Sequence, residues 1–296
     1  MSIIATRGLG KQFPGVLALD ELTVDIEPGV VGLVGSNGAG KSTLIKILLG
    51  LLEPSRGQAS VLGLDIREST KIRELVGYMP EHDCLPPDIS ATEFIVHMAR
   101  ASGLPATAAR ERAADTLRHV GLYEERYRPI GGYSTGMRQR VKLAQALAHD
   151  PKLVFLDEPT NGLDPAGRDE MLALIKRIGG QFGISVLVTS HLLGELERVA
   201  DHLVIIDGGR LLRSQAVAAF TEVSGVLAVE VAEDMDKLGD RLAQAGLRVH
   251  PDGRLLLIDI AGETTYDVVR DCVADLGLAL VRMENRRHRI EEVFSK

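Results

Sequence analysis

Residues 35 to 43 read Gly-Ser-Asn-Gly-Ala-Gly-Lys-Ser-Thr, a complete match to the phosphate-loop pattern G-x-x-x-x-G-K-[S/T]. The apolar run 30–34 precedes this loop and the helical stretch 44–49 follows it. A strand, a glycine-rich loop and a helix N-terminus in this order direct backbone N–H groups and the helix dipole at a phosphate. We expect Lys41 to reach the β- and γ-phosphates and Ser42 to offer its hydroxyl to Mg²⁺. The segment therefore predicts that the chain binds a nucleoside triphosphate. The predicted nucleotide-binding residues of the loop are Gly35, Ser36, Asn37, Gly38, Ala39, Gly40, Lys41, Ser42 and Thr43.

The bulk composition is that of a globular protein with one large and one small domain. The chain has 296 residues, of which 45% are hydrophobic and 25% charged, enough to bury a sizeable core. Its formal net charge of −7 disfavours broad nucleic-acid binding, which needs a basic surface. Two cysteines give no disulfide framework and favour a reducing compartment. The N-terminus lacks the apolar core of a secretory signal, and no run reaches the roughly 18 apolar residues that cross a bilayer. If the protein works at a membrane, we expect another chain to hold it there.

The apolar pattern predicts an α/β core that carries a helical insertion. The short apolar runs 153–156, 184–188 and 203–206 are each followed by polar residues, as in buried parallel strands whose carboxyl ends carry a site. From about residue 88 to 150 the apolar spacing becomes helical. We therefore predict a nucleotide-binding domain over residues 1–221 with a helical subdomain at about 88–150.

The remaining residues, 222–296, predict a small accessory domain of a different kind. Their pattern gives the order strand, helix, strand, strand, helix, strand, which is the ferredoxin-like α+β arrangement. The predicted strands cover 226–231, 247–250, 254–260 and 278–283, and the predicted helices cover 235–245 and 265–276. A short final helix is predicted at Ile290–Phe294.

A second motif places two acids at the end of an apolar strand. Residues 153–156 run directly into Asp157 and Glu158. Asp157 fits the acid that a strand delivers to Mg²⁺ beside a phosphate loop, and Glu158 can polarise a water in line with the γ-phosphate. The alternative is that both are solvated loop residues, but buried adjacent carboxylates are costly without a cation. The pair favours hydrolysis over simple binding.

A third motif, Tyr133-Ser134-Thr135-Gly136-Met137-Arg138-Gln139-Arg140, precedes the apolar helical stretch 141–149. Ser134 and the free backbone N–H groups of a helix start can form a second anion site. Because the phosphate loop already serves the chain's own nucleotide, this site would serve a phosphate bound by another copy. Taken alone, the segment fits an ordinary capped helix equally well.

Together these motifs resemble the ATPase subunit of an ABC transporter over residues 1 to about 220. Residues 133–137 are similar to the family's Leu-Ser-Gly-Gly-Gln signature, and residues 161–164 are similar to its D-loop. His191 stands where the family has a switch histidine, and Phe13 where it has an aromatic residue that stacks on adenine. The fold that this resemblance implies is a P-loop NTPase core of the ABC-ATPase type.

Two positions depart from the family's pattern. Glu81 replaces the glutamine of the family's Q-loop, and Thr135 and Met137 replace Gly and Gln in the signature. An ionised glutamate only accepts hydrogen bonds, whereas glutamine also donates them, yet Glu81 can still face Mg²⁺ directly or through water. Its alternative is a solvent-facing loop acid. These departures resemble the exporter class whose permease is a separate chain, which includes drug, polysaccharide and sodium exporters.

The resemblance implies a mechanism with ATP and Mg²⁺ as ligands. The chain would form a head-to-tail homodimer in which Ser134 and Gly136 of one copy contact the nucleotide of the other. Catalysis would use Glu158 as general base and His191 as γ-phosphate sensor, with Mg²⁺ arranged by the oxygens of three residues. The predicted metal residues are Ser42, Asp157 and Glu81.

The same resemblance implies integral membrane permease subunits as partners. Their contact is expected near residues 81–100, and the chain would lie in the cytoplasm against the inner face of the plasma membrane. The alternative is a soluble ABC ATPase that acts on nucleic acid or ribosomes without a permease. Such proteins usually carry two ATPase modules, coiled coils or zinc modules, and none of these is evident here; no nucleic-acid partner is expected.

Overall fold

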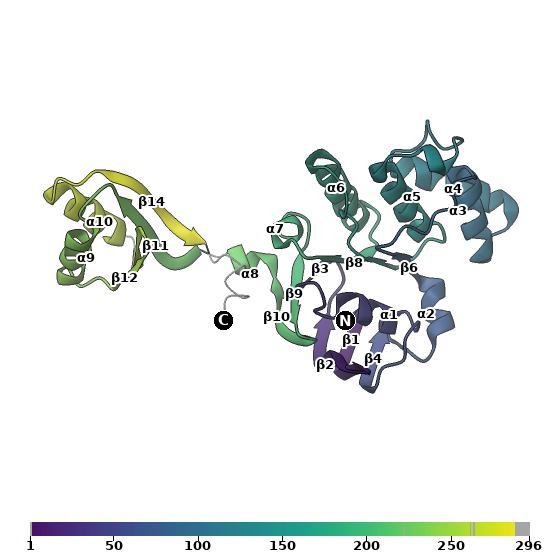
Figure 1. The fold of residues 1–296 in the computed structure, drawn as a ribbon, viewed down its shortest axis with the longest axis horizontal. Helices are drawn as coiled ribbons and strands as arrows, with labels where there is room; N and C mark the ends of the chain where they lie inside the picture. Colours follow the sequence, from purple (N-terminus) through teal and green to yellow (C-terminus); the bar gives the residue numbers. More distant parts are fainter. Residues whose placement is uncertain (1, 222, 261, 263, 288–296) are drawn as a thin grey trace. The chain divides into compact units, whose positions relative to one another are not determined.

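The computed structural model describes residues 2–221, 223–260, 262 and 264–287 (Figure 1). By its internal contacts the chain divides into two compact units, residues 1–217 and 218–296. The division falls just before the boundary predicted at 221/222. The predicted helix Ile290–Phe294 lies outside the described residues.

The first unit opens with an antiparallel sheet in the order β2-β1-β4-β5. Its first two strands form one hairpin. The hairpin turns at Pro14 and Gly15, where Gly15 takes a positive φ of 78° that suits glycine. Phe13 pairs with Val16 beside that turn. The strands are β1 (Ile4–Phe13), β2 (Val16–Ile26), β4 (Arg56–Val61) and β5 (Leu64–Asp65).

A second sheet forms the centre of this unit, in the order β10-β9-β3-β8-β7-β6. Strands β9, β3, β8, β7 and β6 are parallel, and β10 joins the edge antiparallel to β9. The predicted runs 153–156, 184–188 and 203–206 correspond to β7, β8 and β9, whose parallel pairings confirm them. All residues of β3, β7 and β8 are buried. Their carboxyl ends therefore meet at one edge, where α/β sheets place their sites. The bounds are β3 (Val30–Val34), β6 (Val76–Met79), β7 (Leu153–Leu156), β8 (Ser185–Ser190), β9 (His202–Asp207) and β10 (Arg210–Ala216).

Helix α1 (Lys41–Leu48) fills the space between these two sheets. Its buried residues Leu44, Ile45, Ile47 and Leu48 belong to one apolar core with residues of β1, β2 and β3. The phosphate loop, at the start of α1, is thus anchored to both sheets. The remaining helices of the core are α2 (Ser69–Leu75), α6 (Pro165–Gln181) and α7 (Leu193–Leu196), and α8 (Val217–Thr221) lies at the division between the units.

The range in which the sequence predicts a helical subdomain contains the helices α3 (Ala91–Ala101), α4 (Ala106–His119) and α5 (Thr135–Leu147). These helices pack against one another (Figure 1). Ser90 caps α3 through a complete capping box with Glu93. Helix α5 begins at Thr135, earlier than the stretch 141–149 predicts, because Ser134 already acts as its N-cap. None of the helices in the described ranges has the length and apolar character needed to cross a membrane.

The second unit is a four-stranded antiparallel sheet in the order β12-β13-β11-β14, with helices α9 and α10. Buried residues of both helices, such as Leu238 and Val269, share a core with Val229 and Ile258 of the sheet. The order of elements agrees with the predicted one and supports the ferredoxin-like assignment, which stays a prediction. The elements are β11 (Val223–Val231), α9 (Met235–Gln244), β12 (Val249–Asp252), β13 (Leu255–Asp259), α10 (Thr264–Asp275) and β14 (Leu280–Arg287).

Candidate active site

The loop between β3 and α1 has a backbone that only glycine accommodates well. Gly38 and Gly40 have φ angles of 87° and 100°, in the left-handed region that favours glycine. A Cβ atom at Gly40 would lie 2.4 Å from the carbonyl oxygen of Ala18 in β2. The glycine spacing of the motif is therefore a requirement of this backbone, as the sequence predicts for a phosphate loop.

Lys41 is buried and its ammonium lies over the loop that precedes it. Nζ donates hydrogen bonds to the carbonyl oxygens of Gly35 at 2.7 Å and Ser36 at 3.3 Å. It also lies 3.4 Å from Oε1 of Glu158. The phosphate loop therefore holds one buried positive charge, with the acid that follows Asp157 as its counter-ion.

Ser42 and Asp157 meet beside this charge. Ser42 Oγ donates to Asp157 Oδ1 at 3.2 Å, joining the start of α1 to the end of β7. A hydroxyl and a carboxylate are the hard oxygen ligands that Mg²⁺ prefers. In the described part of the chain, no group of three or more His, Cys, Asp or Glu side chains could hold a metal ion. Mg²⁺ usually takes one or two carboxylates and completes its shell with phosphates and water.

Glu158 lies between two basic side chains. His191 Nδ1 is 2.9 Å from Glu158 Oε2, and Lys41 Nζ is on the side of Oε1. Oε1 is buried and accepts no hydrogen bond, although Lys41 is its ion-pair partner, so a water bound there could donate to it. The backbone of Glu158 has a φ of 48°, a strained value for a residue with a side chain. A strained, buried carboxylate beside a phosphate loop is a good candidate to accept a proton from water.

Thr189 is a site residue that the sequence reasoning missed. It is buried in β8, where its Oγ1 donates to Asp157 Oδ1 at 2.8 Å and accepts from the Glu158 N–H at 2.9 Å. One hydroxyl thus fixes both acids. Its position next to Ser190-His191 at the end of an apolar strand was the available signal, but threonine is common in strands and carries no distinctive spacing.

Tyr78 is a half-buried phenol near Asp157 at the carboxyl end of the sheet. Tyr78 lies in β6, beside β7. Burial, assisted by the negative charge of Asp157, raises the pKa of Tyr78 to about 12. Because burial is the main cause, the Tyr78 phenol stays neutral beside Asp157.

Ser134 and Gly136 do not join this cluster. Ser134 Oγ accepts from the Met137 N–H at 3.2 Å as the cap of α5. Both residues line a cavity of about 560 Å³ together with Gly162 and Asp164. None of the residues 35–43, Asp157 or Glu158 lines it. Within one chain the signature and the phosphate loop therefore form two separate sites.

Glu81 and Phe13 contact residues outside the cluster of Lys41, Asp157 and Glu158. Glu81 Oε1 accepts a hydrogen bond from Asn161 Nδ2 at 3.2 Å, and no contact within the described residues joins it to Ser42 or Asp157. Phe13 is 37% exposed, with the Lys11 ammonium 5.2 Å from its ring centroid. An exposed ring is free to stack on a base.

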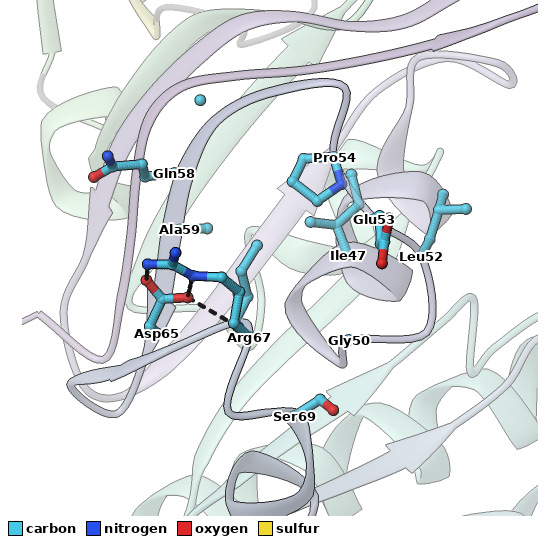
Figure 2. A pocket seen from close by; sticks show the side chains of 12 residues that line it. Ile47, Gly50, Leu52, Glu53, Pro54, Gln58, Ala59, Asp65, Arg67 and Ser69 are labelled. Carbon is cyan, nitrogen blue, oxygen red and sulfur yellow. Dashed lines mark hydrogen bonds and ion pairs between the residues drawn. The ribbon is translucent and has the colours of Figure 1, made fainter.

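A further cavity of about 590 Å³ lies by the opposite end of α1 (Figure 2). It is lined by Ile47 and Gly50 at the end of that helix, and by Asp65 and Arg67, which form a bidentate hydrogen-bonded pair. No residue of the phosphate loop lines it. This cavity is not the nucleotide site.

Comparison with known proteins identifies the class. Residues 19–161 match the family model described as ABC transporter. The chain is 37% identical over 214 residues to the bacitracin transport ATP-binding protein BcrA of Bacillus licheniformis, covering 71% of this chain and 69% of that protein. It is 34% identical over 292 residues to the Nod factor export ATP-binding protein I of Burkholderia pseudomallei, covering 96% and 93%. A solved structure of cbiO1 from Clostridium perfringens, part of the ABC transporter complex cbiONQ, matches with a TM-score of 0.69 and 26% identity, covering 83% of this chain and 97% of that one.

The chain therefore belongs to the ABC transporter family. Within it, the chain is an ATP-binding and ATP-hydrolysing subunit that energises a separate membrane permease. The P-loop NTPase fold of the ABC-ATPase type, predicted from the sequence, is confirmed.

Proposed function

We propose that two copies of this chain form an ATP-dependent, head-to-tail dimer that drives export through a membrane permease. The observation that carries the proposal is the separation, within one chain, of the cavity at Ser134 and Gly136 from the cluster of Lys41, Glu158 and His191. A signature that caps a helix start and faces an open cavity offers N–H groups to an anion. A second copy, turned head to tail, would bring its phosphate loop to that cavity.

The proposed roles of the residues follow from their contacts. The loop 35–43 and Lys41 bind the phosphates, and Phe13 stacks on the base. Glu158 accepts the proton of the attacking water as that water bonds to the γ-phosphorus and the bond to the leaving ADP breaks, and Lys41 Nζ lies 3.4 Å from its Oε1. His191, hydrogen-bonded to Glu158, orients that carboxylate and contacts the γ-phosphate.

We assign Mg²⁺ to the oxygens of Ser42 and Asp157, which already lie within hydrogen-bond distance of each other. Glu81 would join through water, because its present contact is with Asn161 and not with Ser42. The bound ion supplies charge neutralisation for the phosphate oxygens.

The proposals of a permease partner and of export rest on the relatives. Two of them are named for bacitracin transport and for Nod factor export. We propose an export function for this chain too, with the subunit held at the cytoplasmic face of the plasma membrane by its permease. Residues 81–100 are the proposed contact, and this segment includes the exposed residues His82, Asp83 and Cys84.

The head-to-tail arrangement is tested in a Glu158→Gln background, where hydrolysis no longer opens the dimer. With MgATP, light scattering should give twice the monomer mass. Adding Ser134→Arg should abolish that dimer while each monomer still binds ATP through its own loop. Thr107→Arg, on an exposed position of α4, is the matched control and should leave the dimer intact. A dimer that persists with Ser134→Arg contradicts the proposed arrangement.

The permease contact is tested by crosslinking from single cysteines at positions 83–90 to a co-expressed permease. Cys84 is already exposed, so a Cys84→Ser chain provides the background. Crosslinked product from these positions, and none from cysteine at the exposed residue Lys176 of α6, is the expected result. Absence of product at every position from 83 to 90 counts against the contact.

A further inference from the structure

Lys142 is a buried lysine that neither the sequence motifs nor the proposed mechanism uses. It lies in α5, only 2% exposed. Its Nζ donates hydrogen bonds to the carbonyl oxygens of Pro80 and Glu81, each at 2.9 Å, and approaches that of His82 at 3.5 Å. The ammonium of a helix in the helical subdomain thus binds the backbone of the loop that contains Glu81.

These carbonyl groups are the main partners of the buried charge. Among the described residues, no carboxylate lies within ion-pair distance of Lys142 Nζ. Burial lowers the pKa of Lys142, and the negative charges of Asp83 and Glu81 oppose that shift. A buried ammonium is costly unless its donors are satisfied, and here three backbone oxygens from consecutive residues satisfy it. Such an arrangement fixes the path of the loop 80–82 and is indifferent to which side chain stands at position 81.

Two further residues on α5 extend this connection. Arg138 Nε lies 3.2 Å from Asp83 Oδ2, at the far end of the same loop. Gln139 Nε2 donates to the carbonyl oxygen of Asn161 at 3.1 Å, and Asn161 in turn donates to Glu81 Oε1 at 3.2 Å. The helix that begins at the signature therefore holds both the Glu81 loop and the D-loop residue that contacts Glu81.

We propose that Lys142 is a positioning residue that fixes the loop 80–82 to α5, so that Glu81 and the signature at Ser134 and Gly136 keep a constant relation to each other. The inference rests on the proposed function, in which the signature contacts the nucleotide of the other copy and the Glu81 loop belongs to the permease contact. If the permease displaced the loop 80–82, α5 would move with it and would shift the signature at its N-terminus. Conversely, a nucleotide bound at the signature would constrain Glu81.

The test compares three single variants of the purified full-length chain. Lys142→Met removes the ammonium but keeps the length of the side chain. Lys142→Gln keeps an N–H₂ donor, and Lys176→Met removes an exposed lysine from α6 as the control. We expect Lys142→Met to lower kcat for ATP about 10- to 100-fold, the usual cost of a small misplacement, with the KM for ATP within about twofold of the wild type. Lys142→Gln should recover part of kcat, and Lys176→Met should match the wild type.

A double-mutant cycle with Glu81→Ala separates positioning from a general loss of structure. If Lys142 acts through the Glu81 loop, the loss caused by Lys142→Met should be much smaller when residue 81 is already alanine. Multiplicative losses overturn the proposal, as does an unchanged kcat in Lys142→Met. A Glu81→Ala chain with wild-type kcat also overturns it, because the loop would then carry no side chain that needs positioning. If Lys142→Met is too unstable to purify, the cycle is run with Lys142→Gln.

The cycle reports on turnover and not on dimer geometry. A failure of the head-to-tail arrangement would appear in the light-scattering measurement with Ser134→Arg. A failure of the Lys142 proposal would appear only in the coupling between positions 142 and 81. The two results are therefore distinguishable.

Discussion

The hydroxyl of Thr189 accepts a hydrogen bond from the backbone N–H of Glu158 at 2.9 Å. Glu158 has a left-handed φ of 48°, which costs a residue with a side chain about 1–3 kcal/mol unless its surroundings hold it in place. Thr189 also donates to Asp157 at 2.8 Å. The strand β8 thereby positions both acids that end the neighbouring strand β7.

Replacing Thr189 by valine keeps the shape of the side chain and removes both hydrogen bonds. The Glu158 N–H would be left buried without a partner, which costs about 1–3 kcal/mol. We expect the free energy of unfolding to fall by that amount and kcat to fall about tenfold or more, since both acids lose their orientation. Denaturant unfolding and steady-state ATP hydrolysis measure the two effects. Thr189→Ser, which keeps the hydroxyl, should restore most of kcat; a serine variant as slow as the valine variant would refute this role.

A second prediction concerns Asp20 and the stability of the fold. Its side chain is 11% exposed and pairs with both Arg56 and Arg210, which joins β2 to β4 and β10. Because the carboxylate is largely buried while its partners are half exposed or more, we expect Asp20→Asn to lower the free energy of unfolding by about 1–2 kcal/mol.

The matched comparison for Asp20 is the pair of Arg7 and Asp25, which joins β1 to β2 with both side chains about half exposed. Asp25→Asn should cost no more than about 1 kcal/mol. Equal losses of unfolding free energy in urea for the two variants would show that the burial of Asp20 does not increase its contribution to stability.

A further prediction concerns His149 and the loss of folding stability at acid pH. Its Nε2 lies 3.0 Å from the Val76 carbonyl oxygen, and burial lowers the pKa of this imidazole below its ordinary value of 6.5. The unfolded chain then binds a proton at a higher pH than the folded chain does. The stability that the neutral His149 contributes is therefore fully present above about pH 6.5 and is lost as the pH falls through the lower, folded-state pKa. Burial lowers the pKa of His202 in the same direction.

The measurement is the difference in unfolding free energy between pH 8 and pH 5, for the wild type and for His149→Gln. The variant should lose less stability on acidification, since glutamine cannot titrate. His97→Gln, at an exposed position of α3, should keep the wild-type difference. An unchanged difference in His149→Gln would mean that this imidazole does not govern the acid sensitivity.

The sequence predicted those parts of the protein that follow from local pattern. Gly38 and Gly40 need a positive φ. The motif that contains Lys41 and Ser42 already predicts a strand before the loop and a helix after it. Contacts between distant segments were not predictable in this way. Thr189 and Lys142 act through hydrogen bonds to residues 31 to 62 positions away, and neither has a spacing that distinguishes it from an ordinary core residue. Short elements such as β5 and α7 were missed for a similar reason, because two to four residues show no periodicity.

The role of Glu158 as acceptor of the proton from the attacking water is probed by the variant Glu158→Gln. The amide keeps the size of the side chain and loses the basic oxygen. ATP binding, followed with a fluorescent ATP analogue, should stay within about twofold of the wild type, because the phosphate loop is untouched. The turnover of MgATP should fall about 10²- to 10⁴-fold, while Glu111→Gln on the exposed face of α4 should leave it unchanged. Near-normal hydrolysis by Glu158→Gln would contradict the account.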